Sequence, residues 1–125
     1  MRIALLDDNP IQREWTRQSL DAIGHECHSF ADGHSLLREL KVQTYDMLVL
    51  DWAVSDVPGP KVVRWIRNDL NSQLPILVTA TRTAAPPMVE ALAAGADDFL
   101  ALPVTGGEFK ARVTALLRRA YPLQD

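Results

Sequence analysis

Several features that define other classes of protein are missing from this sequence. Its single cysteine, Cys27, has no partner within the chain, so an internal disulfide is excluded. No segment resembles a signal peptide, and no apolar run is long enough to cross a bilayer. We therefore expect a cytoplasmic protein that has no membrane partner.

An excess of positive charge is also missing. The chain has 13 basic and 16 acidic side chains, which give a formal net charge of −3 and a pI near 5.5. A domain of this charge offers phosphate backbones no attractive field, so we expect no direct binding to nucleic acid. With 47% hydrophobic and 23% charged residues, the 125 residues have the composition of one globular domain, which we assign to residues 1–125.

Five short segments predict β-strands. Residues 3–6 and 47–50 are uninterrupted apolar runs that end at aspartate, which is typical of strands buried on both faces of a parallel sheet. The remaining predicted strands are residues 26–30, 76–79 and 99–102.

Helical patterns follow each predicted strand. The first runs from Pro10 to residue 23 and ends at Gly24, because proline suits a first turn and glycine a helix end. The other predicted helices are residues 33–42, 62–66, 88–94 and 108–120. Five strand-to-helix repeats predict an α/β fold, a doubly wound five-stranded parallel sheet with helices on both faces.

Acidic residues stand where several predicted strands end. Asp7 and Asp8 follow the first strand, Asp51 the third, and Thr79 ends the fourth. In such sheets, sites form outside the carboxyl ends of the strands, so these side chains should converge. Because close carboxylates repel one another, we expect a divalent cation there, Mg²⁺ or Mn²⁺. One carboxylate, for which we choose Asp51, could then attack phosphorus while the Thr79 hydroxyl binds the phosphoryl oxygens.

Five motifs together resemble the receiver domain of two-component response regulators, over essentially the whole chain. Leu5-Leu6-Asp7-Asp8-Asn9 is similar to the family's acidic pair, and Leu48-Val49-Leu50-Asp51-Trp52 to its phosphoacceptor strand. Gly59 stands where the family usually has glycine. Pro75-Ile76-Leu77-Val78-Thr79-Ala80 resembles the strand of the switch threonine, and Gly95-Ala96-Asp97-Asp98-Phe99-Leu100 the segment of the switch aromatic.

The resemblance implies a flavodoxin-like, CheY-like fold and a role in a phosphorelay. Asp51 would accept a phosphoryl group from a histidine kinase or phosphotransfer protein in a Mg²⁺-dependent reaction, and the domain would signal to an output domain or protein. It would be no enzyme beyond its own phosphoryl transfer and slow autodephosphorylation. The implied site residues are the metal ligands Asp7, Asp8, Asp51 and the main-chain carbonyl of Ala53, with Thr79 as phosphoryl contact and Phe99 as switch aromatic.

The largest departure from the family is at Leu102-Pro103, where the family has lysine followed by proline. In the family that ammonium contacts the phosphoryl group, whereas leucine has no donor. Leu102 therefore favours an alternative, a degenerate receiver that acts as a protein-interaction module without phosphorylation. Arg82 is a candidate substitute cation, and Lys61 is a weaker one.

Two other functions fit the sequence less well. A phosphohydrolase with an aspartyl phosphate intermediate would usually carry a second carboxylate two residues after Asp51, where this chain has Ala53. A flavin or nucleotide carrier would need glycines after the first strand, and Asp7-Asp8-Asn9-Pro10 has none.

A homodimer is a further possibility for the last helices and strand. Four charged residues there could form salt bridges between two chains, as in some dimeric relatives of the family. They are Asp97, Asp98, Arg112 and Arg118.

Overall fold

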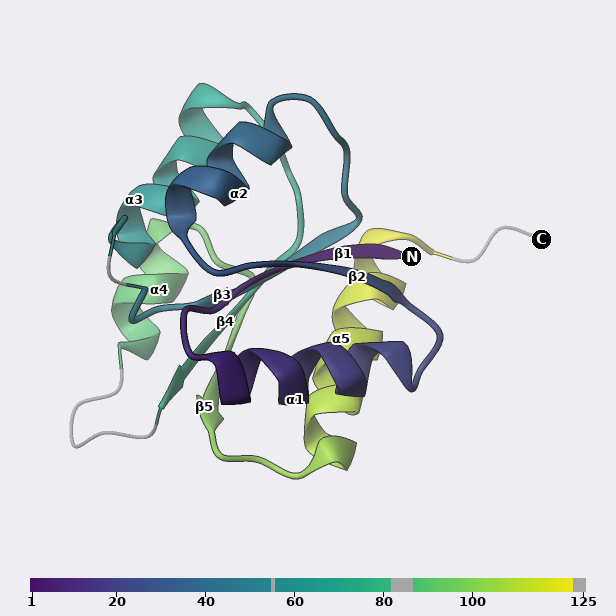
Figure 1. The fold of residues 1–125 in the computed structure, drawn as a ribbon. Helices are drawn as coiled ribbons and strands as arrows, with labels where there is room; N and C mark the ends of the chain where they lie inside the picture. The colour runs from purple at the N-terminus through teal and green to yellow at the C-terminus, as the bar shows by residue number, and fades with distance from the viewer. Residues whose placement is uncertain (55, 82–86, 123–125) are drawn as a thin grey trace.

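In the computed structural model, which describes residues 1–54, 56–81 and 87–122, five parallel strands form one sheet (Figure 1). The strand order is β2-β1-β3-β4-β5, so the order reverses between β1 and β3. The strands are β1 (Arg2–Leu6), β2 (Glu26–Phe30), β3 (Met47–Asp51), β4 (Ile76–Thr81) and β5 (Asp98–Leu102).

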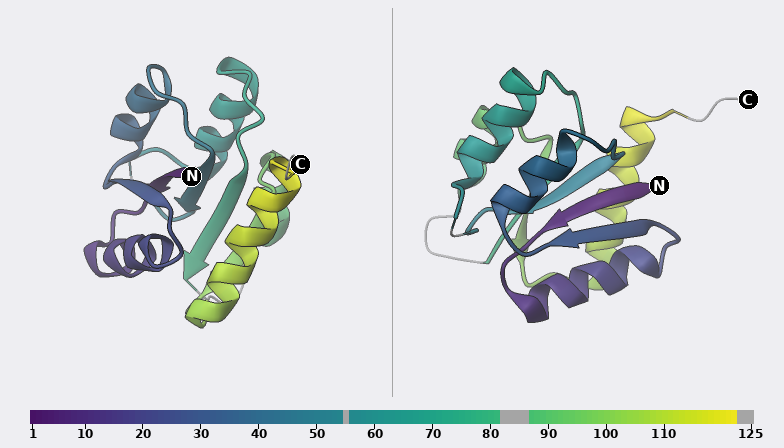
Figure 2. Two further views of the ribbon diagram at one scale, coloured as in Figure 1. Left: turned by 90° about the vertical axis from the view of Figure 1, so that its right-hand side faces the viewer. Right: turned by 45° about the horizontal axis from the view of Figure 1, so that its top comes forward.

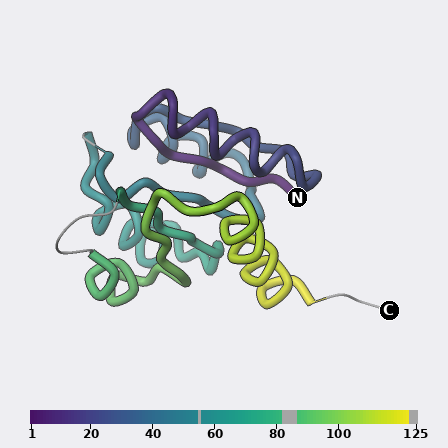
Figure 3. The backbone as a smooth tube through the Cα atoms, turned by 90° about the horizontal axis from the view of Figure 1, so that it is seen from below, coloured from purple at the N-terminus to yellow at the C-terminus, as the bar shows by residue number. Residues whose placement is uncertain are grey.

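Helices cover both faces of this sheet (Figure 2). One face carries α1 (Pro10–Asp21) and α5 (Gly106–Ala120). The other carries α2 (Gly33–Leu40), α3 (Gly59–Arg64) with the π-helical turn η1 (Trp65–Asp69), and α4 (Met88–Ala94). In Figure 3, α1 runs back along β1 after the turn between them. The predicted doubly wound α/β fold is confirmed.

The core consists of two apolar clusters, one on each face of the sheet. Alternate residues of β1 serve the two clusters, since Ala4 and Leu6 pack toward α2 and α3 while Ile3 and Leu5 pack toward α1 and α5. All four side chains are buried. This explains why the strand is an uninterrupted apolar run, because it has no solvent-facing side.

Most elements lie where the sequence predicted them, but several ends differ. The helix predicted for residues 62–66 runs from Gly59 through η1 to Asp69. β4 extends two residues beyond its predicted end, to Thr81. The last helix begins at Gly106 instead of residue 108, because the Thr105 hydroxyl accepts a hydrogen bond from the Glu108 amide and caps the first turn. The first two helices each end two residues early.

Arg67, on η1, joins several separate segments of the chain. Its side chain is only 15% exposed. The guanidinium donates to the main-chain carbonyls of Gly95 at 3.1 Å, Ser72 at 2.9 Å and Leu74 at 2.7 Å, and to Asp97 Oδ2 at 2.9 Å. All three guanidinium nitrogens are therefore used to hold the loop before β4 and the loop before β5 against α3 and η1.

The acidic residues considered for a dimer interface already have partners inside the chain. Asp97 pairs with Arg67 and also accepts a hydrogen bond from the Ile76 amide at 2.8 Å. Asp98 forms an ion pair with Arg112 at 3.2 Å. Arg118 is exposed on α5. The homodimer stays a prediction, and these contacts show that Asp97 serves the fold of the single chain.

We expect Arg67→Met to lower the free energy of unfolding by roughly 2–4 kcal/mol, because it leaves partly buried carbonyls and Asp97 without their charged donor. Urea denaturation measures this. Arg64→Met is the matched control, since Arg64 is exposed at the end of α3 and forms no hydrogen bond or ion pair with the described residues. Its effect should stay within about 0.5 kcal/mol. Equal losses in the two variants would contradict this account of Arg67.

Candidate functional site

The predicted acidic residues meet at the carboxyl edge of the sheet. Asp7 directly follows β1, Asp51 ends β3, and Thr79 lies opposite Asp51 on the adjacent strand β4. One carboxylate oxygen from each of Asp7, Asp8 and Asp51 lies within 4.8 Å of the other two. Asp7 and Asp51 are buried and Asp8 is exposed, so the cluster has one open side. The predicted convergence of these residues is confirmed.

Asp7 is fixed by contacts to all of its polar groups. Its amide donates to the Phe30 carbonyl at 3.1 Å, and its own carbonyl accepts from the Arg13 guanidinium at 2.9 Å. The Asn9 amide donates to Oδ1 at 2.9 Å, and Gln12 Nε2 donates to Oδ2 at 2.6 Å. The sequence reasoning missed Gln12 and Arg13. The available signal was that both are polar residues in the first turn of the helix that follows the acidic pair.

The electrostatics of the cluster favour a cation. Burial, and then the negative charge of Asp7, raise the pKa of Asp51 to about 7, although the Ala53 amide donates to its Oδ1 at 3.3 Å. No lysine or arginine among the described residues forms an ion pair with Asp7, Asp8 or Asp51. Three oxygen donors that have no cationic partner are a ligand set suited to Mg²⁺ or Mn²⁺, so the residues present fit such an ion.

Thr79 and Phe99 are both buried. The Thr79 carbonyl accepts from the Trp52 amide at 2.9 Å, which ties the residue after Asp51 to β4. Phe99 is 9% exposed and packs in the core cluster on the α2–α3–α4 face. Trp52 also donates through Nε1 to Glu90 Oε1 at 3.2 Å. This hydrogen bond connects the loop that follows Asp51 to α4.

Leu102 is buried, at 6% exposed, and lies across from Thr81 in the β4–β5 register. It forms part of the wall of a cavity of about 450 Å³ between the start of α1 and the end of β5. That wall consists of Asn9, Ile11, Gln12, Trp15, Thr81, Leu102, Pro103 and Val104. An apolar surface thus lies at the position where the resemblance to the family predicts a lysine.

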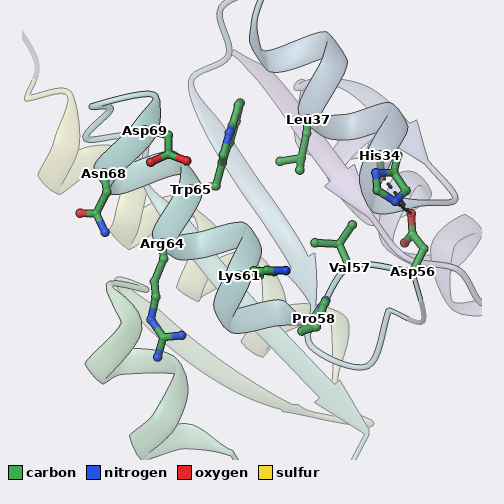
Figure 4. Close-up of a pocket in the computed structure, with 10 residues that line it drawn as sticks. All are labelled: His34, Leu37, Asp56, Val57, Pro58, Lys61, Arg64, Trp65, Asn68 and Asp69. Atoms are coloured by element: carbon green, nitrogen blue, oxygen red, sulfur yellow. Dashed lines mark hydrogen bonds and ion pairs between the residues drawn. The ribbon is translucent and has the colours of Figure 1, made fainter.

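Of the two candidate substitutes for that lysine, the structure describes only Lys61. Arg82 lies outside the described residues. Lys61 lines a groove of about 410 Å³ between α2 and α3, near Val57 and Pro58 (Figure 4), and forms no ion pair with the acidic cluster.

Asp56 connects the loop after β3 to α2 beside the same groove. Its carboxylate accepts from the amides of Gly33 at 2.8 Å and His34 at 3.0 Å, the first turn of α2. The His34 ring lies 3.9 Å from this carboxylate (Figure 4). Asp56 therefore has a structural role at the start of α2.

The fold and the site define a class of protein: a flavodoxin-like domain with an acidic pair after β1, an aspartate at the end of β3 and a threonine opposite it on β4. The chain belongs to the response regulator receiver domain family of two-component systems, which matches residues 3–114. Within the described residues, no helix is both long and apolar enough to cross a membrane.

Individual relatives agree with this assignment. The chain is 38% identical over 125 residues to the response regulator MprA of Mycobacterium avium. This match covers 100% of the chain and 54% of MprA. It thus spans about half the length of the curated relatives it matches. Full-length FixJ from B. japonicum has a TM-score of 0.89 and 26% identity, covering 97% of this chain and 59% of FixJ.

One similar structure contains a metal ion. The receiver domain of the sensor histidine kinase PA1611 from Pseudomonas aeruginosa PAO1 has a TM-score of 0.83 and 25% identity, covering 93% of this chain and 96% of that domain. That structure holds a magnesium ion coordinated in its active site cleft.

In metal-free buffer, we expect Asp51→Asn to stabilise the chain increasingly as pH rises from about 4 to 7. The pKa of Asp51 is raised from 3.8 to about 7 by folding, so its stabilising contribution is complete below pH 4 and is lost as the folded carboxyl ionises. The difference from wild type should grow by on the order of 2–4 kcal/mol over this range and then level off. Urea denaturation at several pH values measures it.

The control for this pH series is Asp69→Asn, which neutralises an exposed carboxylate on η1. Because this carboxylate is exposed, its replacement should change the free energy of unfolding by no more than about 0.5 kcal/mol. An Asp51→Asn difference that does not grow with pH would contradict the raised pKa of Asp51.

Proposed function

We propose that the domain accepts a phosphoryl group on Asp51 from a histidine kinase or phosphotransfer protein and signals to an output domain or protein. The observation that carries this proposal is the convergence of three carboxylate oxygens within 4.8 Å at the sheet edge, beside Thr79. Membership of the receiver family supports it. Because the chain covers about half of its curated relatives, the output partner is part of the proposal.

The proposed reaction forms one bond and breaks one. A carboxylate oxygen of Asp51 attacks phosphorus of a phosphohistidine, the phosphorus–nitrogen bond breaks, and the imidazole leaves with the bonding electron pair and takes up a proton. The product is an acyl phosphate on Asp51. The Thr79 hydroxyl would donate a hydrogen bond to a phosphoryl oxygen, since Thr79 lies opposite Asp51 on the next strand.

The proposed cation is Mg²⁺, with Mn²⁺ as a substitute. Asp7, Asp8 and Asp51 would hold it together with the main-chain carbonyl of Ala53, a residue whose main-chain N–H donates to Asp51 Oδ1 at 3.3 Å. When bound, it would neutralise the charge that accumulates between the carboxylates and the phosphoryl oxygens. The magnesium ion in the PA1611 receiver domain supports this choice.

Two contacts could carry the phosphorylated state to the surface. Thr79 lies on β4 next to β5, where Phe99 pairs with Val78, so movement of the threonine bears on the packing of the switch aromatic. Trp52 connects the phosphoacceptor loop to Glu90 on α4. We propose α4 and the β5 edge as the regions that change when Asp51 is phosphorylated.

The competing proposal is a degenerate receiver that binds a partner without phosphorylation. The specific observation in its favour is Leu102, which gives an apolar surface where the family has an ammonium group. A charge-assisted hydrogen bond of this kind contributes roughly 1.5–3 kcal/mol. The two proposals are separated by whether Asp51 can be phosphorylated at all.

We expect incubation with acetyl phosphate and Mg²⁺ to add one phosphoryl group to the chain, measured by intact-mass spectrometry. The gain should disappear in Asp51→Asn and in a sample that contains excess chelator, since both the acceptor and the cation are required. No gain under conditions that phosphorylate an ordinary receiver domain would support the degenerate module instead.

We expect Leu102→Lys to raise the initial rate of this phosphorylation about tenfold, because it supplies a charge-assisted donor to the phosphoryl group. The cavity beside Leu102 provides room for the longer side chain. Leu102→Met is the matched control, since it lengthens the side chain but adds no charge. Equal rates for the lysine and methionine variants would show that the missing ammonium does not limit the reaction.

A further inference from the structure

Gln12 contacts the Asp7 carboxylate through its side-chain amide, from the helix that follows the acidic pair. Gln12 lies in the first turn of α1, where its main-chain amide donates to Asn9 Oδ1 at 3.0 Å. From there Nε2 donates to Asp7 Oδ2 at 2.6 Å. The half-buried side chain also lines the cavity next to Leu102. Gln12 thus stands between the acidic cluster and the apolar surface that replaces the family's lysine.

We propose that Gln12 is a positioning residue that holds Asp7 in the orientation required for cation binding and thereby sets the affinity of the site for Mg²⁺. This inference rests on the proposed function, because it assumes that the acidic cluster binds a cation. It adds to that function a residue outside the ligand set.

The two hydrogen bonds on the Asp7 carboxylate act together. The main-chain amide of Asn9 donates to Oδ1, and the side-chain amide of Gln12 donates to Oδ2. The carboxylate therefore cannot rotate about its Cβ–Cγ bond without losing one of these two hydrogen bonds. A carboxylate that is already oriented loses less entropy when it binds a cation. In known metal sites, removal of such an outer partner lowers metal affinity 10- to 100-fold.

The chemical nature of the donor also matters. An amide is neutral, so Gln12 orients Asp7 but leaves its negative charge available for a cation. A lysine or arginine in the same place would neutralise that charge and compete with the ion. Gln12 therefore restrains the geometry of the cluster and preserves its field.

The backbone of Asp7 has separate supports, which makes the inference testable. Its amide bonds to Phe30 and its carbonyl to Arg13, so removal of the Gln12 amide leaves the main chain of Asp7 held in place. A change at Gln12 should act mainly on the carboxylate of Asp7.

Isothermal titration of Gln12→Met with Mg²⁺ tests the proposal, because methionine keeps the length of the side chain but has no amide. We expect the dissociation constant to rise at least tenfold, with the same direction of change for Mn²⁺. The matched control is Gln18→Met on the same helix. Gln18 donates to Glu14 at 3.1 Å on the exposed surface, so its loss should leave the dissociation constant unchanged.

Gln12→Asn is the second variant, since it keeps the amide but is one methylene too short to reach Asp7. A positioning role predicts that it also binds Mg²⁺ more weakly. If asparagine restored wild-type affinity, polarity and not the hydrogen bond would be sufficient, and the proposal would be overturned. Denaturation in metal-free buffer, run on each variant, identifies any loss of affinity that follows from unfolding.

The outcomes separate this inference from the proposed function. A wild-type chain that binds no Mg²⁺ overturns both. A wild-type chain that binds Mg²⁺, together with folded Gln12→Met and Gln12→Asn variants of equal affinity, overturns the positioning role alone. Weaker binding by both folded variants, with Gln18→Met unchanged, supports the role of Gln12.

Discussion

Mutual repulsion between carboxylates at one edge of the sheet is the constraint that shapes the rest of this domain. Adjacent parallel strands bring Asp7 and Asp51 together, and Asp8 completes a cluster whose oxygens lie within 4.8 Å of one another. Burial of Asp51, and then the negative charge of Asp7, raise the pKa of Asp51 to about 7. The two apolar clusters on either side of the sheet hold the strands in this register despite the repulsion. The fold therefore maintains a site whose charge is balanced most simply by a cation.

The surroundings of the cluster differ from the receiver pattern in one respect that affects chemistry. Leu102 and the cavity beside it present apolar surface where the resemblance to the family predicts a lysine, and no described cation contacts the carboxylates. The N–H groups that donate to these carboxylates are neutral. The main-chain amide of Asn9 and the side-chain amide of Gln12 donate to Asp7, and the main-chain amide of Ala53 donates to Asp51. These donors orient carboxylates but do not neutralise them. If the site works as proposed, it would depend on a bound ion more heavily than a site that contains an ammonium group.

Other interactions determine how changes at this site can reach the surface. Trp52, next to Asp51, donates a hydrogen bond to the Thr79 carbonyl through its main-chain amide and to Glu90 through its indole, so it connects β3, β4 and α4. Arg67 holds the loops before β4 and β5 at the opposite end of these strands through four hydrogen bonds. One end of the sheet is therefore firmly fixed. At the end that bears the carboxylates, the described residues connect to α4 through the exposed hydrogen bond between Trp52 and Glu90. This difference supports the proposal that α4 would respond if Asp51 is phosphorylated.

The sequence by itself determined the fold class and the composition of the acidic site. Uninterrupted apolar runs that alternate with helical patterns specify a parallel sheet, and the carboxyl ends of its strands meet at one edge, so the convergence of Asp7 and Asp51 followed from the pattern. Only the tertiary structure decided the hydrogen bond from Gln12 to Asp7, the engagement of Asp97 by Arg67 and the cavity next to Leu102. The physical reason is that periodicity reports which face of an element is buried. It does not report which rotamer a polar side chain adopts or which distant group packing places within its reach.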